Sequence, residues 1–374
     1  MSASEAVPAS GGTRRVSSMV RPHLRGLVPY VPILPTDVLS REGGIAPETI
    51  IKLDGNENPY GPSPQVRVAL ERFDAYHIYP DPNQGTLRSK LAEYLGVSPA
   101  SIVPGNGSDE IIDLLMRMFL EPGDTVVNCS PTFGMYPFVA QVCGAQLAEV
   151  ARRPDFSLDL DAVLRVLGRP ASKLIFLASP NNPSGNPVVR SELQALLTTG
   201  AIVVVDEAYQ EFSSAPSYAG EVAQHENLVV LRTFSKWAGL AGLRVGYGIM
   251  TPPLARLMDQ VKPPYNVNVA GLVAAEASLD DRTHILDRVA WIIEERSRLF
   301  DQLRAVSFLE PIPSEANFIL CRVRGKEAGE VKQNLERRGI FIKHIDTPLL
   351  PNALRFSVGK PEHTAAITAA LGSM

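Results

Sequence analysis

Short runs of mainly hydrophobic residues recur along the middle of the chain. They cover residues 125–129, 173–178, 201–205, 228–231 and 245–250, are rich in Val and Ile, and are separated by several helical stretches. Runs that are hydrophobic on both faces are typical of buried strands in a mostly parallel sheet that helices cover on each side. The pattern therefore predicts an α/β core with a mostly parallel sheet.

One helix of this core is well specified by its hydrophobic spacing. Its hydrophobic residues follow the i, i+3, i+4, i+7, i+8 pattern of a helix face: Ile111, Leu114, Leu115, Met118 and Phe119. Polar residues 108–110 precede them, and a Pro-Gly pair at 122–123 follows. We therefore expect a helix that begins near residue 108 and ends before residue 121.

The last hundred residues follow a different pattern. A helical pattern covers residues 270–303, and the charged stretch 280–304 predicts one long exposed helix. Strands are expected at 317–323, 339–343 and 353–358, with a helix at 327–338 and a final helix from about residue 362. This order predicts a second, smaller α+β domain.

The length of the chain agrees with more than one domain. At about 150 residues per domain, 374 residues indicate two to three domains. We expect a large domain over residues 54–269 and a small one over 270–374. The Pro-rich residues 21–53 are expected to pack on the small domain, and residues 1–20 to form a flexible tail rather than a transit peptide.

Composition and charge narrow the class of partner. Hydrophobic residues make up 45% and charged residues 20% of the chain, as in soluble folded proteins, and no hydrophobic run is long enough for a transmembrane helix. The net charge is −4 without a block of like charges, which gives no support to a nucleic acid or membrane partner. Three scattered cysteines suggest a reducing compartment. A small-molecule partner is therefore expected.

Polar residues follow the predicted strands, at the sheet edge where α/β proteins bind ligands. They are Asn182, Asp206, Tyr209, Ser235, Lys236 and Arg244. This set resembles the fold type I aminotransferases that depend on pyridoxal 5′-phosphate. The resemblance implies a large domain with a mostly parallel sheet of seven strands. The resemblance implies that Lys236 forms a Schiff base with the cofactor and acts as general base. It also implies that Asp206 keeps the ring nitrogen protonated, while Tyr209 and Asn182 bind the ring's phenolic oxygen.

The cofactor phosphate needs backbone N–H groups and a cation. Gly107, Ser108 and Asp109 open the helix described above, and with Ser235 and Arg244 they are expected to form the phosphate site.

An aromatic residue is expected against the cofactor ring. Phe133 stands where the family places a stacked aromatic side chain, although packing in the core would also explain a phenylalanine there.

Four segments narrow the resemblance to the histidinol-phosphate aminotransferase family. They are residues 53–62, 232–236, 238–244 and 354–359, and the resemblance extends over residues 21–371. It implies transfer of an amino group between L-histidinol phosphate and 2-oxoglutarate, giving imidazole acetol phosphate and glutamate, in histidine biosynthesis. A cytoplasmic enzyme is expected.

The resemblance also implies a substrate site shared between two subunits. Tyr60 would come from the neighbouring subunit of a homodimer, Arg355 would bind the anionic group of the substrate, and Asn317 would line the same pocket. Lys343 departs from the family, because many relatives carry a second arginine there. A lysine still offers a positive charge, although without the two-pronged geometry of an arginine.

Other functions share most of these residues. An aromatic aminotransferase and, less closely, a threonine-phosphate decarboxylase have similar motifs. A binding protein that keeps the fold without catalysis is a third alternative, which the complete set of site residues disfavours.

Overall fold

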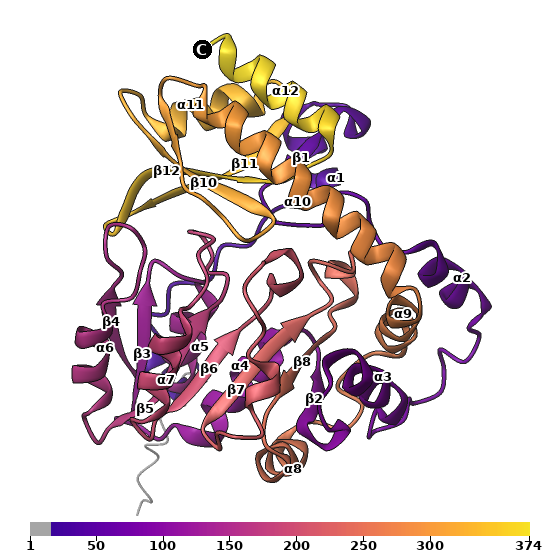
Figure 1. Ribbon diagram of the computed structural model, residues 1–374, viewed down its shortest axis with the longest axis vertical. Coiled ribbons are helices and arrows are strands. Elements are labelled where there is room, and N and C mark those ends of the chain that lie inside the picture. The colour runs from indigo at the N-terminus through magenta and orange to yellow at the C-terminus, as the bar shows by residue number, and fades with distance from the viewer. Residues whose placement is uncertain (1–15) are drawn as a thin grey trace, which may run out of the picture.

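A computed structural model describes residues 16–374, which form two units with one sheet each (Figure 1). In this part of the chain the larger sheet has seven strands in the order β2-β8-β7-β6-β5-β3-β4. The strands are β2 (Ile102–Gly105), β3 (Thr125–Ser130), β4 (Gln146–Ala151), β5 (Ser172–Ala178), β6 (Ile202–Asp206), β7 (Leu228–Thr233) and β8 (Gly246–Ile249). Strands β4, β3, β5, β6 and β7 run parallel, and only β8 pairs antiparallel, with β7 and with β2. The predicted α/β class with a mostly parallel sheet is confirmed.

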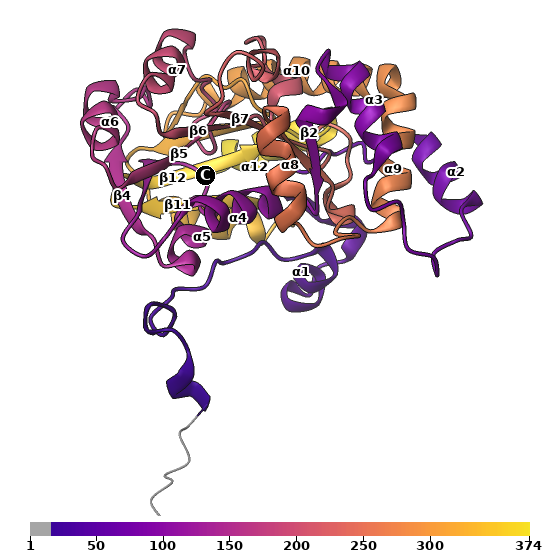
Figure 2. The same ribbon diagram turned by 90° about the horizontal axis from the view of Figure 1, so that it is seen from below.

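Hydrophobic side chains alternate between the two faces of this sheet. Along β5, Leu174 and Phe176 belong to one buried cluster, and Ile175 and Leu177 belong to the other. The first cluster contains side chains of α4 (Ser108–Phe119), α5 (Met135–Cys143) and α8 (Pro252–Val261). The second contains side chains of α3 (Gly85–Leu95), α6 (Leu160–Leu167), α7 (Arg190–Leu197) and α9 (Val269–Asp280). Helices thus cover both faces (Figure 2), which explains the continuous hydrophobic strands.

The smaller unit is built on a five-stranded sheet within the described residues, in the order β1-β11-β12-β10-β9. Its strands are β1 (Ile51–Leu53), β9 (Leu309–Pro311), β10 (Phe318–Val323), β11 (Ile340–Thr347) and β12 (Leu350–Ser357). Its helices are α10 (Arg282–Arg304), α11 (Ala328–Glu336) and α12 (Pro361–Gly372). The expectation that the long helix is exposed was wrong for one of its faces, because α10 buries residues such as Ile285, Ile292 and Leu299.

The N-terminal part of the described chain contacts both units. Strand β1 pairs in parallel with β11 of the smaller sheet. By contrast, a ring nitrogen of His23 lies 3.3 Å from the carbonyl oxygen of Val142, and the ring of Tyr30 packs edge-on against Phe138, both on α5 of the larger unit. Residues 21–53 therefore do not pack on the smaller unit alone. Helices α1 (Thr36–Gly43) and α2 (Pro64–Arg72) flank β1 along the chain.

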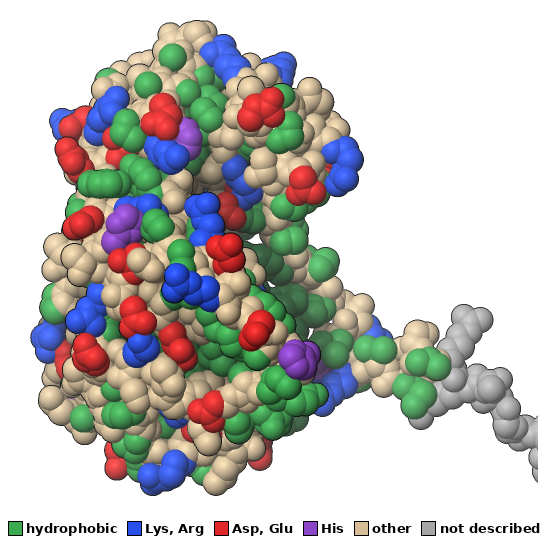
Figure 3. Space-filling view, turned by 90° about the vertical axis from the view of Figure 1, so that its right-hand side faces the viewer, with side chains coloured by type: hydrophobic (Ala, Val, Ile, Leu, Met, Phe, Trp, Pro, Cys, Tyr) green, Lys and Arg blue, Asp and Glu red, His purple; other side chains and the backbone are tan. Residues whose placement is uncertain are grey.

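The first described residues extend away from the rest of the molecule (Figure 2). Hydrophobic side chains are exposed along this segment (Figure 3). Val16 and Met19 are exposed at its start, and Val28 and Val31 are exposed farther along the chain, on either side of the residue Tyr30 that contacts α5. The tail expected over residues 1–20 falls largely on residues 1–15, which lie outside the described residues. No helix of residues 16–374 is long and hydrophobic enough to cross a membrane.

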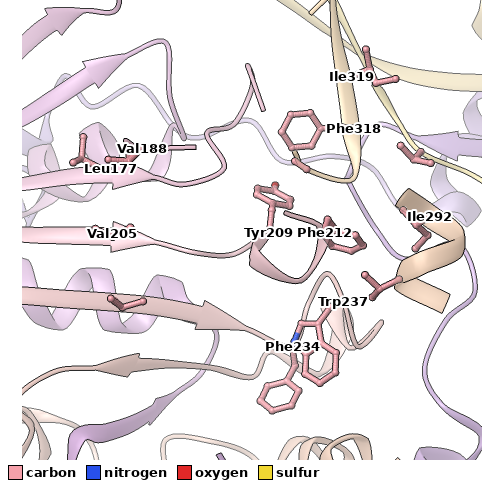
Figure 4. Packing of buried hydrophobic residues seen from close by; sticks show 14 of the residues in the cluster. Leu177, Val188, Val205, Tyr209, Phe212, Phe234, Trp237, Ile292, Phe318 and Ile319 are labelled. Atoms are coloured by element: carbon pink, nitrogen blue, oxygen red, sulfur yellow. The ribbon is translucent and has the colours of Figure 1, made fainter. Parts of the chain in front are cut away.

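Aromatic residues join the two units at the carboxyl ends of the central strands (Figure 4). Tyr209, which follows β6, packs edge-on against Phe318 of β10, with 5.1 Å between ring centroids. Phe234 and Trp237, which follow β7, are buried in the same hydrophobic cluster as Tyr209 and Phe318. The core therefore continues from one unit into the other around the sheet edge where ligands are expected.

Candidate active site

A cavity of about 440 Å³ lies at the carboxyl ends of β5, β6 and β7. Most of the predicted site residues line it, namely Ser108, Asp109, Phe133, Asn182, Asp206, Tyr209, Ser235, Lys236, Arg244, Lys343 and Arg355. They come from segments far apart in the sequence, because adjacent parallel strands end at the same edge of the sheet.

Lys236 presents its amine to this cavity. The amine donates a hydrogen bond to the carbonyl oxygen of Gly55 at 2.9 Å. Burial, followed by the positive charges of Arg355 and Arg244, lowers the pKa of Lys236 to about 8. A substantial fraction of the amine is therefore neutral near pH 8, which is the form that acts as a nucleophile.

Asp206 ends β6 and is 4% exposed. Its carboxylate accepts hydrogen bonds from the hydroxyl of Tyr136 at 2.7 Å and from the backbone N–H of Ala208 at 3.1 Å. Burial raises the pKa of Asp206 to about 6. Because no cationic side chain pairs with it among the described residues, this carboxylate is suited to a cationic ligand group.

Tyr209 is held by a residue that the sequence did not single out. The side-chain N–H of Asn56 donates to the Tyr209 hydroxyl at 3.0 Å, and burial raises the pKa of Tyr209. The hydroxyl of Ser357 in turn donates to Asn56 at 2.8 Å. Asn56 has φ of +53°, in the region that asparagine tolerates better than most residues. Asn56 lies in the segment 53–62 that resembles the family, and this resemblance assigned it no role.

The N-terminus of α4 closes one end of the cavity. Gly107 precedes it with φ of +78°, and a Cβ there would lie 2.5 Å from the Arg244 guanidinium. Arg244 donates to the Asp109 carboxylate at 2.9 Å, so the Asp109 side chain pairs with a cation. Ser235 accepts a hydrogen bond from the hydroxyl of Thr233 at 3.0 Å. The backbone N–H groups of the first turn of a helix, an arginine and a hydroxyl here suit a phosphate group.

Two cations face the cavity from the smaller unit. Lys343 and Arg355 are directly opposite each other on β11 and β12, so their side chains lie on one face of the sheet. Arg355 donates to Asn182 Oδ1 and to the carbonyl oxygen of Asp54, both at 2.6 Å. Within residues 16–374, no hydrogen bond or ion pair engages the Lys343 amine, and burial and Arg355 lower its pKa. The pair therefore offers positive charge to an anionic ligand.

Three predicted residues do not line the cavity. Gly107 lies against Arg244, as described, and the side chain of Asn317 donates to the carbonyl oxygen of Asn56, a residue of the cavity wall, at 3.0 Å. The ring of Tyr60 packs edge-on against Trp291 at 5.5 Å between centroids. The structure thus places Tyr60 outside the cavity of its own chain.

Phe133 lines the cavity and also packs in the core. Its ring lies edge-on to Tyr136, with 5.5 Å between centroids. The ring therefore both faces the cavity and packs against the core.

The residues present fit pyridoxal 5′-phosphate, the cofactor that the resemblance implies. The amine of Lys236 suits its aldehyde, the buried Asp206 carboxylate suits its ring nitrogen, and the N-terminus of α4 with Arg244 suits its phosphate.

Comparison with known proteins agrees with this geometry. Residues 48–371 match the family of class I and II aminotransferases. The chloroplastic histidinol-phosphate aminotransferase of Nicotiana tabacum is 49% identical over 351 residues, covering 94% of this chain and 85% of the relative. The histidinol-phosphate aminotransferase of Roseiflexus castenholzii is 45% identical over 360 residues, covering 94% and 97%.

A solved structure gives the same result. It is histidinol-phosphate aminotransferase from Sinorhizobium meliloti in complex with pyridoxal 5′-phosphate, with a TM-score of 0.85, 28% identity and coverage of 94% of this chain and 96% of that one. The sequence identity, the coverage and the fold together show that the chain belongs to the histidinol-phosphate aminotransferase family within the class I and II aminotransferases.

Proposed function

We propose that this chain transfers an amino group between L-histidinol phosphate and 2-oxoglutarate, in histidine biosynthesis, with pyridoxal 5′-phosphate bound at Lys236. The observation that carries the proposal is one cavity that holds a lysine amine of lowered pKa, a buried carboxylate and two cations from the smaller unit. The names of the relatives support the same reaction.

The residues of the larger unit would hold the cofactor. Pyridoxal 5′-phosphate supplies an aldehyde that bonds to an amine and a ring that draws electrons from the substrate carbon. The backbone N–H groups of Ser108 and Asp109, with Ser235 and Arg244, would bind its phosphate. Asp206 would keep the ring nitrogen protonated, because a carboxylate beside it favours the charged form.

Two side chains have a donor left for the phenolic oxygen of the cofactor. Asn56 donates to the Tyr209 oxygen, which leaves the Tyr209 O–H free to donate. Arg355 occupies Oδ1 of Asn182, which leaves the side-chain N–H groups of Asn182 free. Both donors would stabilise negative charge on that oxygen.

Lys236 would carry out the proton transfer. Once the substrate amine has replaced it on the cofactor, its own amine is free to take the proton from the substrate carbon that bears the amino group. The same amine would then give a proton to the carbon atom of the cofactor's former aldehyde group. One group would thus serve first as base and then as acid. A pKa near neutrality suits a group that must do both.

The anionic group of the substrate would bind between Lys343 and Arg355. Arg355 is held by hydrogen bonds to Asn182 and Asp54, whereas no partner among residues 16–374 engages the amine of Lys343. The same two cations would bind a carboxylate of 2-oxoglutarate when that substrate takes its turn in the cavity. This arrangement supports a phosphate or carboxylate substrate, with Lys343 as the point charge that replaces a second arginine.

The active unit is proposed to be a homodimer in which Tyr60 reaches the cavity of a second copy. In one chain Tyr60 packs on Trp291 instead of lining the cavity, and the large side chains of Tyr76, Ile78 and Tyr79 are exposed on the same N-terminal half. The cytoplasmic location stays a prediction, since the relatives include both bacterial proteins and chloroplastic plant proteins.

A substrate comparison tests the proposal. Protein loaded with pyridoxal 5′-phosphate is supplied with 2-oxoglutarate and either L-histidinol phosphate, L-phenylalanine or O-phosphothreonine at equal concentrations. We expect glutamate to form fastest with L-histidinol phosphate. Faster reaction with L-phenylalanine would favour an aromatic aminotransferase, and release of carbon dioxide from O-phosphothreonine would favour a decarboxylase.

A further inference from the structure

Tyr136 makes a contact that the proposed function does not yet use. It lies in the first turn of α5, is fully buried, and donates its hydroxyl proton to Asp206 Oδ2 at 2.7 Å. Its ring stacks on Phe176 of β5 with 5.0 Å between centroids and meets Phe133 edge-on at 5.5 Å. The side chain therefore connects the aromatic wall of the cavity to the buried carboxylate.

Packing alone does not account for the hydroxyl. A phenylalanine would fill the same space between Phe176 and Phe133, and burying a hydroxyl costs free energy unless it has a partner. Among the described residues its hydrogen bond runs to Asp206 and to no other group. The hydroxyl is therefore explained by what it does to that carboxylate.

Asp206 is held by one donor on each oxygen. Tyr136 binds Oδ2, and the backbone N–H of Ala208 binds Oδ1. Each carboxylate oxygen can accept more than one hydrogen bond, so both keep a free acceptor position. The two donors fix the plane of the carboxylate and leave its remaining acceptor positions to the cavity, which Asp206 and Tyr136 both line.

We propose that Tyr136 is a positioning residue for the cofactor: its hydroxyl orients the Asp206 carboxylate and keeps it ionised for the protonated ring nitrogen. The inference rests on the proposed function, because it needs pyridoxal 5′-phosphate in this cavity. The charged groups near Asp206 that act against ionisation are Asp109 and Glu207, and the Tyr136 hydrogen bond acts in the opposite direction.

The test compares two ligands that differ only at the ring nitrogen. One is pyridoxal 5′-phosphate, and the other is its analogue in which a C–H group replaces that nitrogen. We expect Tyr136→Phe to weaken binding of pyridoxal 5′-phosphate to the cofactor-free protein by roughly 10- to 100-fold, as for a hydrogen bond to a charged group. Binding of the analogue should change by less than about twofold, because it has no nitrogen to protonate.

A matched control shows whether the effect is specific to Tyr136 or follows from the loss of any buried hydroxyl. Tyr218 is also buried and donates its hydroxyl to the carbonyl oxygen of Val188 at 2.7 Å, but it does not line the cavity. Tyr218→Phe should leave the affinity for both ligands unchanged. Equal weakening of both ligands by Tyr136→Phe would show that Tyr136 only supports the packing of the wall and would overturn the inference.

A second variant keeps the test decisive if Tyr136→Phe is less stable. In an Asp206→Asn background, the change of Tyr136 to Phe should have no further effect on the affinity for pyridoxal 5′-phosphate, since the group through which it acts is gone. A further loss of similar size in that background would also overturn the inference. Failure of the unaltered protein to bind pyridoxal 5′-phosphate at all would instead refute the proposed function.

Discussion

At Lys236, burial and two neighbouring guanidinium groups act in the same direction on one amine. They lower its pKa to about 8, well below that of a free lysine side chain. The neutral amine exists above that pH, and it is the form that attacks an aldehyde.

The rate of cofactor attachment should follow this titration. We expect the rate at which cofactor-free protein bonds to pyridoxal 5′-phosphate to rise with pH up to about 8 and to level off above it. Stopped-flow absorbance measures the rate. The control is N-acetyl-lysine methyl amide, whose amine has a pKa of about 10.4. Its rate of reaction with pyridoxal 5′-phosphate should continue to rise above pH 8 in the same assay. A protein profile that matches that of the free amine would show that the cavity does not activate Lys236.

Lys343 should bind the phosphate group of the substrate through its charged amine. Lys343→Met is expected to raise KM for L-histidinol phosphate by roughly 10- to 100-fold, because a hydrogen bond to a charged group is lost. KM for unphosphorylated L-histidinol should change little in steady-state assays. Lys343→Arg should retain the phosphate preference, since it keeps the charge.

A neighbouring lysine provides the control. Lys332 forms an ion pair with Glu336 at 2.6 Å within α11 and does not line the cavity. Lys332→Met should therefore leave both KM values unchanged. An equal effect of the two substitutions would mean that Lys343 contributes only to the general charge of this side of the molecule.

The sequence identified the residues that react but not those that hold them. Lys236 and Asp206 follow hydrophobic strands, so their placement at one edge of the sheet could be predicted from the pattern. Asn56 and Tyr136 act through hydrogen bonds to Tyr209 and Asp206, from segments that only the fold brings near. No spacing in the sequence encodes such contacts.

At the scale of elements, a buried group of charges joins the ends of β6 and β7. Arg232 of β7 donates to Glu207 at 3.0 Å and to Glu211 at 2.6 Å, and all three side chains are at most 4% exposed. Glu207 also accepts hydrogen bonds from the hydroxyl of Ser217 and the backbone N–H of Tyr218, both at 2.6 Å. The segments that carry Asp206 and Lys236 are fixed to each other through this group.

Replacement of Arg232 should therefore lower the stability of the protein strongly. Arg232→Met leaves two buried carboxylates without a cation and is expected to lower the free energy of unfolding by about 3–5 kcal/mol, measured by urea denaturation. Arg324→Met removes an exposed partner of Glu310 and should cost less than about 1 kcal/mol. A cost for Arg232→Met as small as that of the control would mean that the buried carboxylates take up protons without loss of structure.

Strands were predictable to the extent that they are buried on both faces. The central strands are continuous hydrophobic runs and lie within a few residues of their predicted positions. Strand β4 was missed because it is the edge strand and its polar positions Gln146 and Glu149 face solvent. Strands β1 and β9 have three residues each, too few for a pattern, and they form because a longer strand lies beside them.

At the scale of the whole molecule, a shared site should be detectable by mixing subunits. We expect that Lys236→Ala and Tyr60→Phe proteins, unfolded and refolded together, regain activity above the mean of the two, toward about a quarter of the unaltered value. A mixed dimer would contain one site with an intact Lys236 from one copy and an intact Tyr60 from the other.

The control for this experiment combines two residues of one cavity. Lys236 and Asp206 line the same cavity of a single chain, so a mixture of Lys236→Ala and Asp206→Asn proteins has no intact site and should gain nothing. If the Tyr60 mixture behaves in the same way, Tyr60 does not act across the subunits.

Strand β1 pairs with β11 although the paired residues, 51–53 and 340–342, lie far apart in the sequence. During synthesis on a ribosome, residues 51–53 emerge early, whereas residues 340–342 emerge near the end, and the larger unit can fold in the interval. Strand β1, at the edge of the smaller sheet, cannot pair until β11 has been made. The cavity residues 54–57 follow β1 directly, so they cannot reach their final positions before then. The newly made chain thus completes its ligand site last, so a truncated product that lacks the final strands has no finished cavity in which to retain a cofactor.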